Sequence, residues 1–230
     1  MSLIKSTGHI YSPVIVTVWE DVSLPIKKGG KEMARYREPV LKRCRYLGIS
    51  PTLIGLDKES NRKQAGNKHK KISEYGIQLK EKQKLKFVYG VGEKQFRKYF
   101  DMASNTKGKT GEVLLQILES RLDNIVFRLG FARTRAEARM QVTHGAFEVN
   151  GNKVDIPSYL VKAGDVISIR EIRRDNGTIK ASVEQCASRL IPEWLEKDAE
   201  KLSGKVVRLA SREDIDIPVE EHLIVELYSK

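Results

Sequence analysis

The sequence feature that most constrains the fold is a change of hydrophobic period between residues 112 and 169. The first part carries leucines and isoleucines at steps of three and four, a spacing that lays one apolar stripe along an α-helix. The stripe consists of Leu114, Leu118, Leu122, Ile125 and Leu129. It predicts a single helix from about Glu112 to Leu129, ended by Gly130.

A second helix is predicted after a short turn. Thr134 and Glu137 have the spacing of a capping box, in which the hydroxyl accepts a backbone N–H and the carboxylate reaches back to the cap. This helix is expected to end near His144 and Gly145, because glycine readily takes the left-handed conformation that closes helices.

The period then changes to that of a strand. Phe147 and Val149 alternate with polar residues, as in a half-buried strand. Asn150-Gly151 is the strongest two-residue hairpin signal, and a further strand is expected over residues 166–169. The whole stretch predicts two helices followed by a small sheet.

Arginines flank both predicted helices. Arg135 and Arg139 lie four residues apart on the second helix, and Arg133 stands before its cap. Arg121 and Arg128 flank the apolar stripe of the first helix. Guanidinium groups grip phosphate oxygens and stack on bases, so these side chains are expected to form one cationic shelf. The alternative is a solvated face on which they pair with neighbouring carboxylates, namely those of Glu119, Asp123 and Glu137.

The same stretch resembles a known family. Its run from Arg121 to Arg135, with four shorter motifs, is similar to the small ribosomal subunit protein four family, the namesake of the S-four RNA-binding domain. The shorter motifs are Ala138-Arg139, His144-Gly145, Val149-Asn150-Gly151 and Ile156-Pro157-Ser158-Tyr159. The resemblance implies an α+β protein, with a mainly helical N-terminal domain and a two-helix, small-sheet S-four RNA-binding domain.

The resemblance also implies a structural function rather than an enzymatic one. It implies a primary binder of small-subunit ribosomal RNA that nucleates assembly of the subunit body and contributes, with neighbouring ribosomal proteins, to translational accuracy. The implied partners are this RNA, the S-five protein and messenger RNA near the entry channel, in the cytoplasmic ribosome. No cofactor or metal is expected, since Cys44 and Cys186 do not make a four-ligand zinc set.

Positive charge is concentrated in one segment of the chain. The 230 residues hold 42 Lys and Arg against 30 Asp and Glu, a net charge of +12. Residues 35–98 hold 18 basic and 6 acidic side chains, so this segment carries the whole excess. Such a balance favours a polyanionic partner. The alternative, a lysine-rich solvated face, explains a single cluster better than the imbalance of a whole segment.

Four regions are expected along the chain. Residues 1–32 form an N-terminal extension, 33–112 a basic helical domain, 113–205 the S-four RNA-binding domain, and 206–230 a C-terminal segment that returns to the N-terminal domain. The residues expected to bind RNA are Arg35, Tyr36, Arg37, Lys42, Arg43, Arg45, Lys70, Lys71, Lys80, Lys82, Lys84, Lys86, Arg97, Arg121, Asn124, Arg128, Arg133, Arg135, Arg139, His144, Asn150 and Lys153.

The extension has two interpretations. Residues 28–32 can be encoded by a purine-rich ribosome-binding sequence, and Met33 begins a run that resembles the usual start of bacterial members of the family. We hypothesise that residues 1–32 are a translated leader; the alternative is a genuine N-terminal tail. Residues Val16 to Trp19 suggest a strand. The apolar run from Val14 to Val18 falls far short of the roughly 18 to 20 apolar residues of a membrane span.

The C-terminal residues 193–230 hold 10 acidic and 6 basic groups, which suits contact with protein better than with phosphate. Trp194 is expected to be a packed anchor.

Three other functions are disfavoured. Arg121-Leu122-Asp123 resembles the Arg-Leu-Asp of pseudouridine synthases, but no catalytic domain follows it. Lys107 to Gly111 lacks the spacing and the preceding strand of a phosphate-binding loop. A small stand-alone heat-shock RNA binder would lack both the long basic N-terminal domain and the C-terminal tail.

Overall fold

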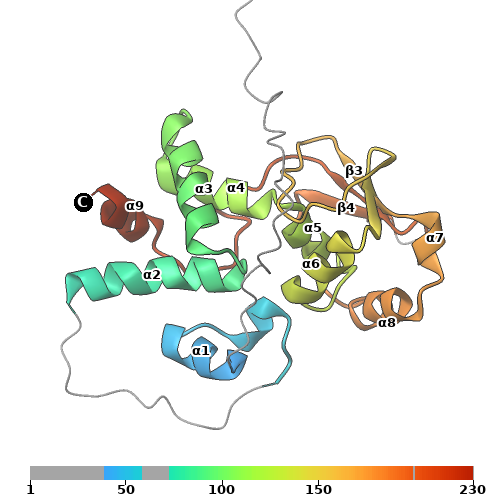
Figure 1. The fold of residues 1–230 in the computed structure, drawn as a ribbon, viewed down its shortest axis with the longest axis horizontal. Coiled ribbons are helices and arrows are strands. Elements are labelled where there is room, and N and C mark those ends of the chain that lie inside the picture. Colours follow the sequence, from blue (N-terminus) through green and yellow to red (C-terminus); the bar gives the residue numbers. More distant parts are fainter. Residues whose placement is uncertain (1–38, 59–72, 199, 230) are drawn as a thin grey trace, which may run out of the picture. The chain divides into compact units, whose positions relative to one another are not determined.

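The computed structural model describes residues 39–58, 73–198 and 200–229 (Figure 1). Its helices are α1 (Val40–Leu47), the 3-10 helix η1 (Pro51–Ile54), α2 (Glu74–Val88), α3 (Glu93–Asn105), α4 (Thr110–Glu119), α5 (Leu122–Arg128), α6 (Arg135–Thr143), α7 (Glu171–Arg174), α8 (Gly177–Gln185) and α9 (Glu221–Ser229). Its strands are β1 (Phe147–Val149), β2 (Asn152–Lys153), β3 (Val166–Ile169), β4 (Leu195–Asp198) and β5 (Ser203–Val206). The strand suggested at residues 16–19 and the hypothesised leader lie outside the described residues.

In the described part of the basic segment, a glycine turn separates α2 from α3. α2 begins after Ser73, whose hydroxyl accepts the N–H of Gly76 at 3.2 Å. α2 ends at Val88 and is capped by Tyr89, and Gly90 takes a φ of 62° before α3 begins. The break between α2 and α3 therefore falls at residues 89–92.

The single helix predicted for residues 112–129 is wrong, because the chain makes two helices, α4 and α5. Arg121, between them, is extended, with φ −68° and ψ 137°, and forms an isolated antiparallel bridge with Leu160. The N–H of Leu122 at the start of α5 donates to the carbonyl of Tyr159 at 2.9 Å. A segment distant in sequence therefore accepts a backbone N–H at the start of α5, where the helix itself offers no acceptor. No glycine, proline or change of apolar period marks this boundary in the sequence.

Local signals predict α6 and the hairpin correctly. The hydroxyl of Thr134 accepts the N–H of Glu137 at 3.2 Å, and the Glu137 carboxylate accepts the N–H of Arg133 at 2.9 Å. The Glu137 carboxylate therefore binds the N–H of Arg133, the residue before the cap, rather than the N–H of the cap residue Thr134. Asn150 and Gly151 have φ values of 50° and 80°, the positive pair that a tight hairpin turn between β1 and β2 requires.

The sheet contains two strands that the sequence does not predict. All pairs are antiparallel, in the order β2-β1-β3-β5-β4, with Val149 of β1 opposite Ile167 of β3. β4 and β5 have only four residues each, and most of these are charged, small or polar. Their sequences therefore carry too little apolar alternation to signal a strand.

Two clusters of buried apolar side chains organise the described residues. One joins α5, α6 and α8 to the sheet and includes Trp194, which is 2% exposed. The prediction of Trp194 as a packed anchor is confirmed. The other joins α2, α3 and α4 to the C-terminal segment, whose α9 lies beside α2 (Figure 1). Ile224 on α9 is fully buried. The predicted fold class, α+β, is confirmed.

Within the described ranges, no helix combines the length and the apolar character needed to cross a bilayer.

Candidate nucleic-acid interface

Basic side chains gather where α6 ends and the hairpin begins, with His144 and Lys153 exposed and Arg170 half-buried. His144 is exposed and ends α6, as predicted for a helix-end residue. Lys153 on β2 lies over Gly145, where an added Cβ would come within 2.6 Å of Lys153 Cε. Arg170 Nη1 donates to the carbonyl of Gly145 at 3.3 Å. We call His144, Lys153 and Arg170 the Gly145 patch; it brings together basic side chains suited to contact with backbone phosphates.

Arg133 precedes the helix that leads to this patch, and Arg139 lies on it. The Arg133 side chain is exposed just before the cap of α6. Arg139 is half-buried, and its Nη1 donates to the carbonyl of Gly90 at 2.9 Å, which ties α6 to the turn between α2 and α3. Burial lowers the pKa of Arg139 below its ordinary value.

The predicted lysines of α2 are half-buried, and three of them are engaged by carboxylates. Lys82 and Lys86 donate to Glu93 at 3.0 and 2.5 Å, and Lys84 donates to Glu81 at 2.5 Å. Burial of Glu93 opposes its ionisation, but hydrogen bonds from these lysines outweigh burial and lower its pKa to about 2. α2 therefore presents less free positive charge than its sequence suggests.

Other predicted residues of the basic segment lie at or near the surface. Lys42 on α1 and Arg97 on α3 are exposed. Arg43 is half-buried and donates from Nη2 to Gln83 Oε1 at 2.8 Å. Arg45 and Lys80 are half-buried. The predicted contacts Arg35, Tyr36, Arg37, Lys70 and Lys71 lie outside the described residues.

Asn150 is exposed, but its amide stabilises the hairpin. Its Nδ2 donates to Asp165 Oδ1 at 2.8 Å, and its Oδ1 accepts the N–H of Val166 at 2.9 Å. These two bonds tie the β1–β2 turn to the start of β3.

Arg121 is buried and paired inside the protein. Its Nε and Nη2 donate to the two carboxylate oxygens of Asp123 at 3.0 and 2.6 Å, and its Nη1 donates to the hydroxyl of Tyr99 at 2.5 Å. The Arg121 side chain is only 2% exposed. Asp123 is also buried and bound by this pair, so the Arg-Leu-Asp motif does not present a nucleophile.

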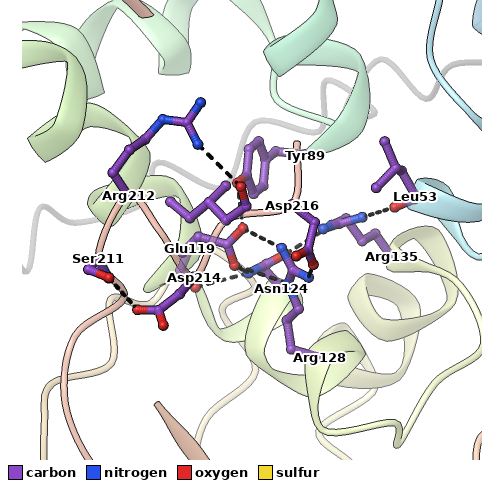
Figure 2. A network of polar contacts seen from close by, with 11 residues as sticks. Leu53, Tyr89, Glu119, Asn124, Arg128, Arg135, Ser211, Arg212, Asp214 and Asp216 are labelled. Carbon is purple, nitrogen blue, oxygen red and sulfur yellow. Dashed lines mark hydrogen bonds and ion pairs between the residues drawn. The ribbon is translucent and has the colours of Figure 1, made fainter. Parts of the chain in front are cut away.

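A second buried cluster surrounds Glu119 at the end of α4 (Figure 2). Its Oε1 accepts from the Tyr89 hydroxyl at 2.6 Å and from Arg128 Nη2 at 2.9 Å. Its Oε2 accepts from Asn124 Nδ2 at 2.5 Å and from Arg128 Nε at 3.2 Å. Arg128 Nη1 also donates to Asp216 at 3.0 Å, which ties the C-terminal segment to the cluster.

Arg135 joins this cluster from α6 (Figure 2). Its Nε donates to Asn124 Oδ1 at 2.9 Å, and its Nη1 donates to the carbonyl of Leu53 in η1. Its guanidinium carbon lies 4.3 Å from the ring centre of Phe127 and 5.4 Å from that of Tyr89. These contacts hold Arg135 in the interior, at 7% exposure.

Burial and mutual charge set the protonation states of the cluster. Burial, with Arg128 as a second cause, lowers the pKa of Arg135 to about 10, which still leaves a cation at neutral pH. Burial acts to raise the pKa of Glu119, but Arg128 and Arg135 outweigh it and hold that pKa below its ordinary value. Burial and the Glu119 charge raise the pKa of Tyr89, so its hydroxyl keeps the proton that it donates.

The predicted shelf of exposed guanidiniums is therefore wrong. Arg121 and Arg135 are buried, Arg128 is half-buried against Glu119, and Asn124 is 1% exposed. Their polar atoms bind carboxylates, a hydroxyl and a backbone carbonyl within the protein. The alternative pairing with carboxylates does occur, but in the interior rather than on a solvated face. We leave Arg121, Asn124 and Arg135 out of the proposed RNA contacts.

Sequence interpretation misses Arg189, which follows α8. Its Nη1 donates to the carbonyls of Phe127 and Ala132 at 2.8 and 3.1 Å, and its Nη2 to that of Arg133 at 2.9 Å. Its guanidinium carbon lies 4.4 Å from the Phe127 ring centre. Arg189 thus secures the turn between α5 and α6. Its partners are mostly backbone carbonyls, which leave no pattern of side chains in the sequence.

Two sequence families match the chain. The family described as "Ribosomal protein S4/S9 N-terminal domain" matches residues 35–119, and the "S4 domain" matches residues 120–167. The two matches adjoin at the boundary between α4 and α5. A basic helical segment followed by an S4 domain is therefore the class of protein that the fold and the interface define.

The chain also aligns with curated relatives over the whole length of each relative. The small ribosomal subunit protein uS4 of Agathobacter rectalis is 58% identical over 198 residues, that of Lachnospira eligens 59% over 198, and that of Lachnoclostridium phytofermentans 57% over 199. Each alignment covers 86% of this chain and 100% of the relative. The chain belongs to the ribosomal protein S4 family, a family of structural ribosomal proteins and not of enzymes. The resemblance inferred from the sequence motifs is confirmed.

Proposed function

We propose that the chain is a primary binder of small-subunit ribosomal RNA that nucleates assembly of the subunit body. One observation carries the proposal: the whole net charge of +12 falls in residues 35–98, within the N-terminal family match that precedes the S4 domain. Positive charge that meets phosphates releases condensed counterions, which supplies affinity without reading base sequence. The Gly145 patch supports the proposal by adding cations on the S4 domain.

The mode of binding follows from two cationic surfaces on one chain. The N-terminal surface includes the exposed Lys42 and Arg97, and the second consists of the Gly145 patch with Arg133. Phosphate contacts recognise the shape of folded RNA rather than its sequence. A protein whose two surfaces fit one arrangement of RNA helices stabilises that arrangement over its competitors. Nucleation of assembly requires this selectivity.

The C-terminal segment is proposed to contact protein. Residues 193–230 hold 10 acidic and 6 basic groups, and the side chains of Asp216 and Glu220 are each 67% exposed. An acidic surface repels RNA and suits a protein partner, for which we propose the neighbouring S-five protein. Through this contact, and through messenger RNA near the entry channel, the chain would contribute to translational accuracy in the cytoplasmic ribosome.

Hydroxyl-radical footprinting of the full chain on naked small-subunit ribosomal RNA tests the proposal. The expected result is protection of two separate backbone segments that meet at one junction of helices. Protection spread evenly along the RNA would contradict the proposed primary binding.

A further inference from the structure

The 3-10 helix of the basic segment lies against the turn between α5 and α6 of the S4 domain. Gly55, which ends η1, is buried and has a φ of 85°. A Cβ built on Gly55 would overlap the carbonyl oxygen of Arg133 and come within 3.0 Å of the Phe127 ring. The approach of the two backbones therefore requires glycine, both for its conformation and for its lack of a side chain.

Two arginines that lie over the Phe127 ring secure the same contact. Arg135 donates to the Leu53 carbonyl of η1 and stacks at 4.3 Å from the ring centre of Phe127. Arg189 stacks at 4.4 Å from the same centre and holds the Arg133 carbonyl at 2.9 Å. This arrangement ties a turn of the basic segment to a turn of the S4 domain by several independent contacts. We call it the η1 joint, formed by Leu53, Gly55, Phe127, Arg133, Arg135 and Arg189.

We infer that the η1 joint fixes the relation between the two cationic surfaces, and that Gly55 and Arg135 are positioning residues for RNA binding. The inference rests on the proposed function, since it explains how two surfaces act on one RNA. When two sites are held in a relation that matches their ligand, the second contact forms at high effective concentration. When the geometry no longer matches, that gain is lost. The buried Arg135 thus acts on RNA through η1 and not by touching a phosphate.

The chain offers a matched pair of variants for the test. Gly55→Ala places a methyl group against the Arg133 carbonyl without changing any charge. Gly48→Ala strains the backbone in a similar way, since Gly48 has a φ of 71°, but its Cβ would meet nothing within 4 Å. A difference between the two variants therefore reports the joint and not backbone strain in this segment.

The probes are two RNAs defined by the footprint of the wild-type chain. One is the smallest ribosomal fragment that holds both protected segments, and the other is a hairpin that holds only the segment protected by the S4 domain. We expect Gly55→Ala to lose about tenfold or more of its affinity for the two-segment RNA. It should bind the single hairpin as the wild-type chain does, and Gly48→Ala should match the wild-type chain on both probes.

Each outcome decides the inference. Full affinity of Gly55→Ala for the two-segment RNA would overturn it, as would an equal loss in Gly48→Ala. If Gly55→Ala also loses affinity for the single hairpin, Arg135→Gln is measured in its place. A loss of affinity for the two-segment RNA alone would then support the inference, and full affinity for that RNA would overturn it. A wild-type chain that binds both probes equally would instead contradict the proposed function, so the two failures are distinguishable.

Discussion

The hydroxyl of Tyr89 at the end of α2 donates a 2.6 Å hydrogen bond to the carboxylate of Glu119 at the end of α4, and both residues are buried. The bond joins two helices whose ends meet at the start of the S4 domain. The Glu119 carboxylate also accepts hydrogen bonds from Arg128 and Asn124. Removing any one of these partners would therefore leave a buried polar group with fewer hydrogen bonds.

Tyr89→Phe tests this relationship. The change removes one hydrogen bond to a buried carboxylate and leaves the ring in place. It should lower the free energy of unfolding by about 1.5 to 3 kcal/mol, the range for hydrogen bonds to charged groups. Urea unfolding followed by circular dichroism measures the loss. Tyr46→Phe is the control, because Tyr46 is 63% exposed and should leave stability unchanged. Equal losses in the two variants would contradict the account.

Arg121→Met tests the buried ion pair. Removing the guanidinium leaves the carboxylate of Asp123 buried without its partner, which should cost about 3 to 5 kcal/mol. Thermal and urea unfolding measure this cost. Arg133→Met, at an exposed position, should leave stability within about 0.5 kcal/mol of the wild-type chain. A mild effect of Arg121→Met would show that its side chain is free rather than buried.

Glu93 should make stability fall in acid. Burial opposes ionisation, but Lys86, Lys82 and Tyr228 together lower the pKa of Glu93 from 4.5 to about 2. A carboxyl with a lowered pKa stabilises the fold above its unfolded pKa, and this contribution disappears as the pH falls from about 4.5 towards about 2. Glu93→Gln should therefore show a shallower loss of stability than the wild-type chain over this window.

Urea unfolding at a series of pH values measures both slopes, and the exposed Glu184→Gln serves as control. Since the Glu93 side chain is 51% exposed, solvent screening keeps its contribution modest. Parallel curves for Glu93→Gln and the wild-type chain would rule out the proposed linkage.

Ile224→Ala tests whether α9 belongs to the core of the basic helical segment. Ile224 is fully buried among residues of α2, α3 and α4, so the truncation should cost about 2 to 5 kcal/mol. Leu190→Ala provides the comparison, because Leu190 is 92% exposed. If Ile224→Ala unfolded with the wild-type midpoint in urea, the C-terminal helix would not be packed as described.

The features predicted well from sequence are those encoded by neighbouring residues. The capping box of Thr134 and Glu137 and the Asn150-Gly151 turn depend on side chains and φ values within a few positions. The break at Arg121 depends instead on hydrogen bonds to a segment near Tyr159. Periodicity cannot show it, because the buried positions of α4 and α5 keep a helical spacing across the boundary.

The same difference between local and distant partners applies to the residues of the candidate interface. An arginine on a predicted helix has the same sequence spacing whether its guanidinium binds an RNA phosphate or a carboxylate of the protein, so the spacing does not tell the two apart. Arg135 is buried because Asn124 and the Leu53 carbonyl reach it from other elements. His144 and Lys153 remain at the surface because they follow the end of α6 and the hairpin turn, which local signals do predict.

We propose that this chain binds folded small-subunit ribosomal RNA through surface cations. The most direct test of this proposal is the affinity of the full chain for that RNA and for an unrelated RNA duplex, measured over a series of salt concentrations. We predict clearly tighter binding to the ribosomal RNA, with a salt dependence that Lys153→Ala reduces by about one ion and Arg121→Met leaves unchanged at salt where it is folded. Equal affinity for both RNAs, or a salt dependence unaffected by Lys153→Ala, would contradict the account.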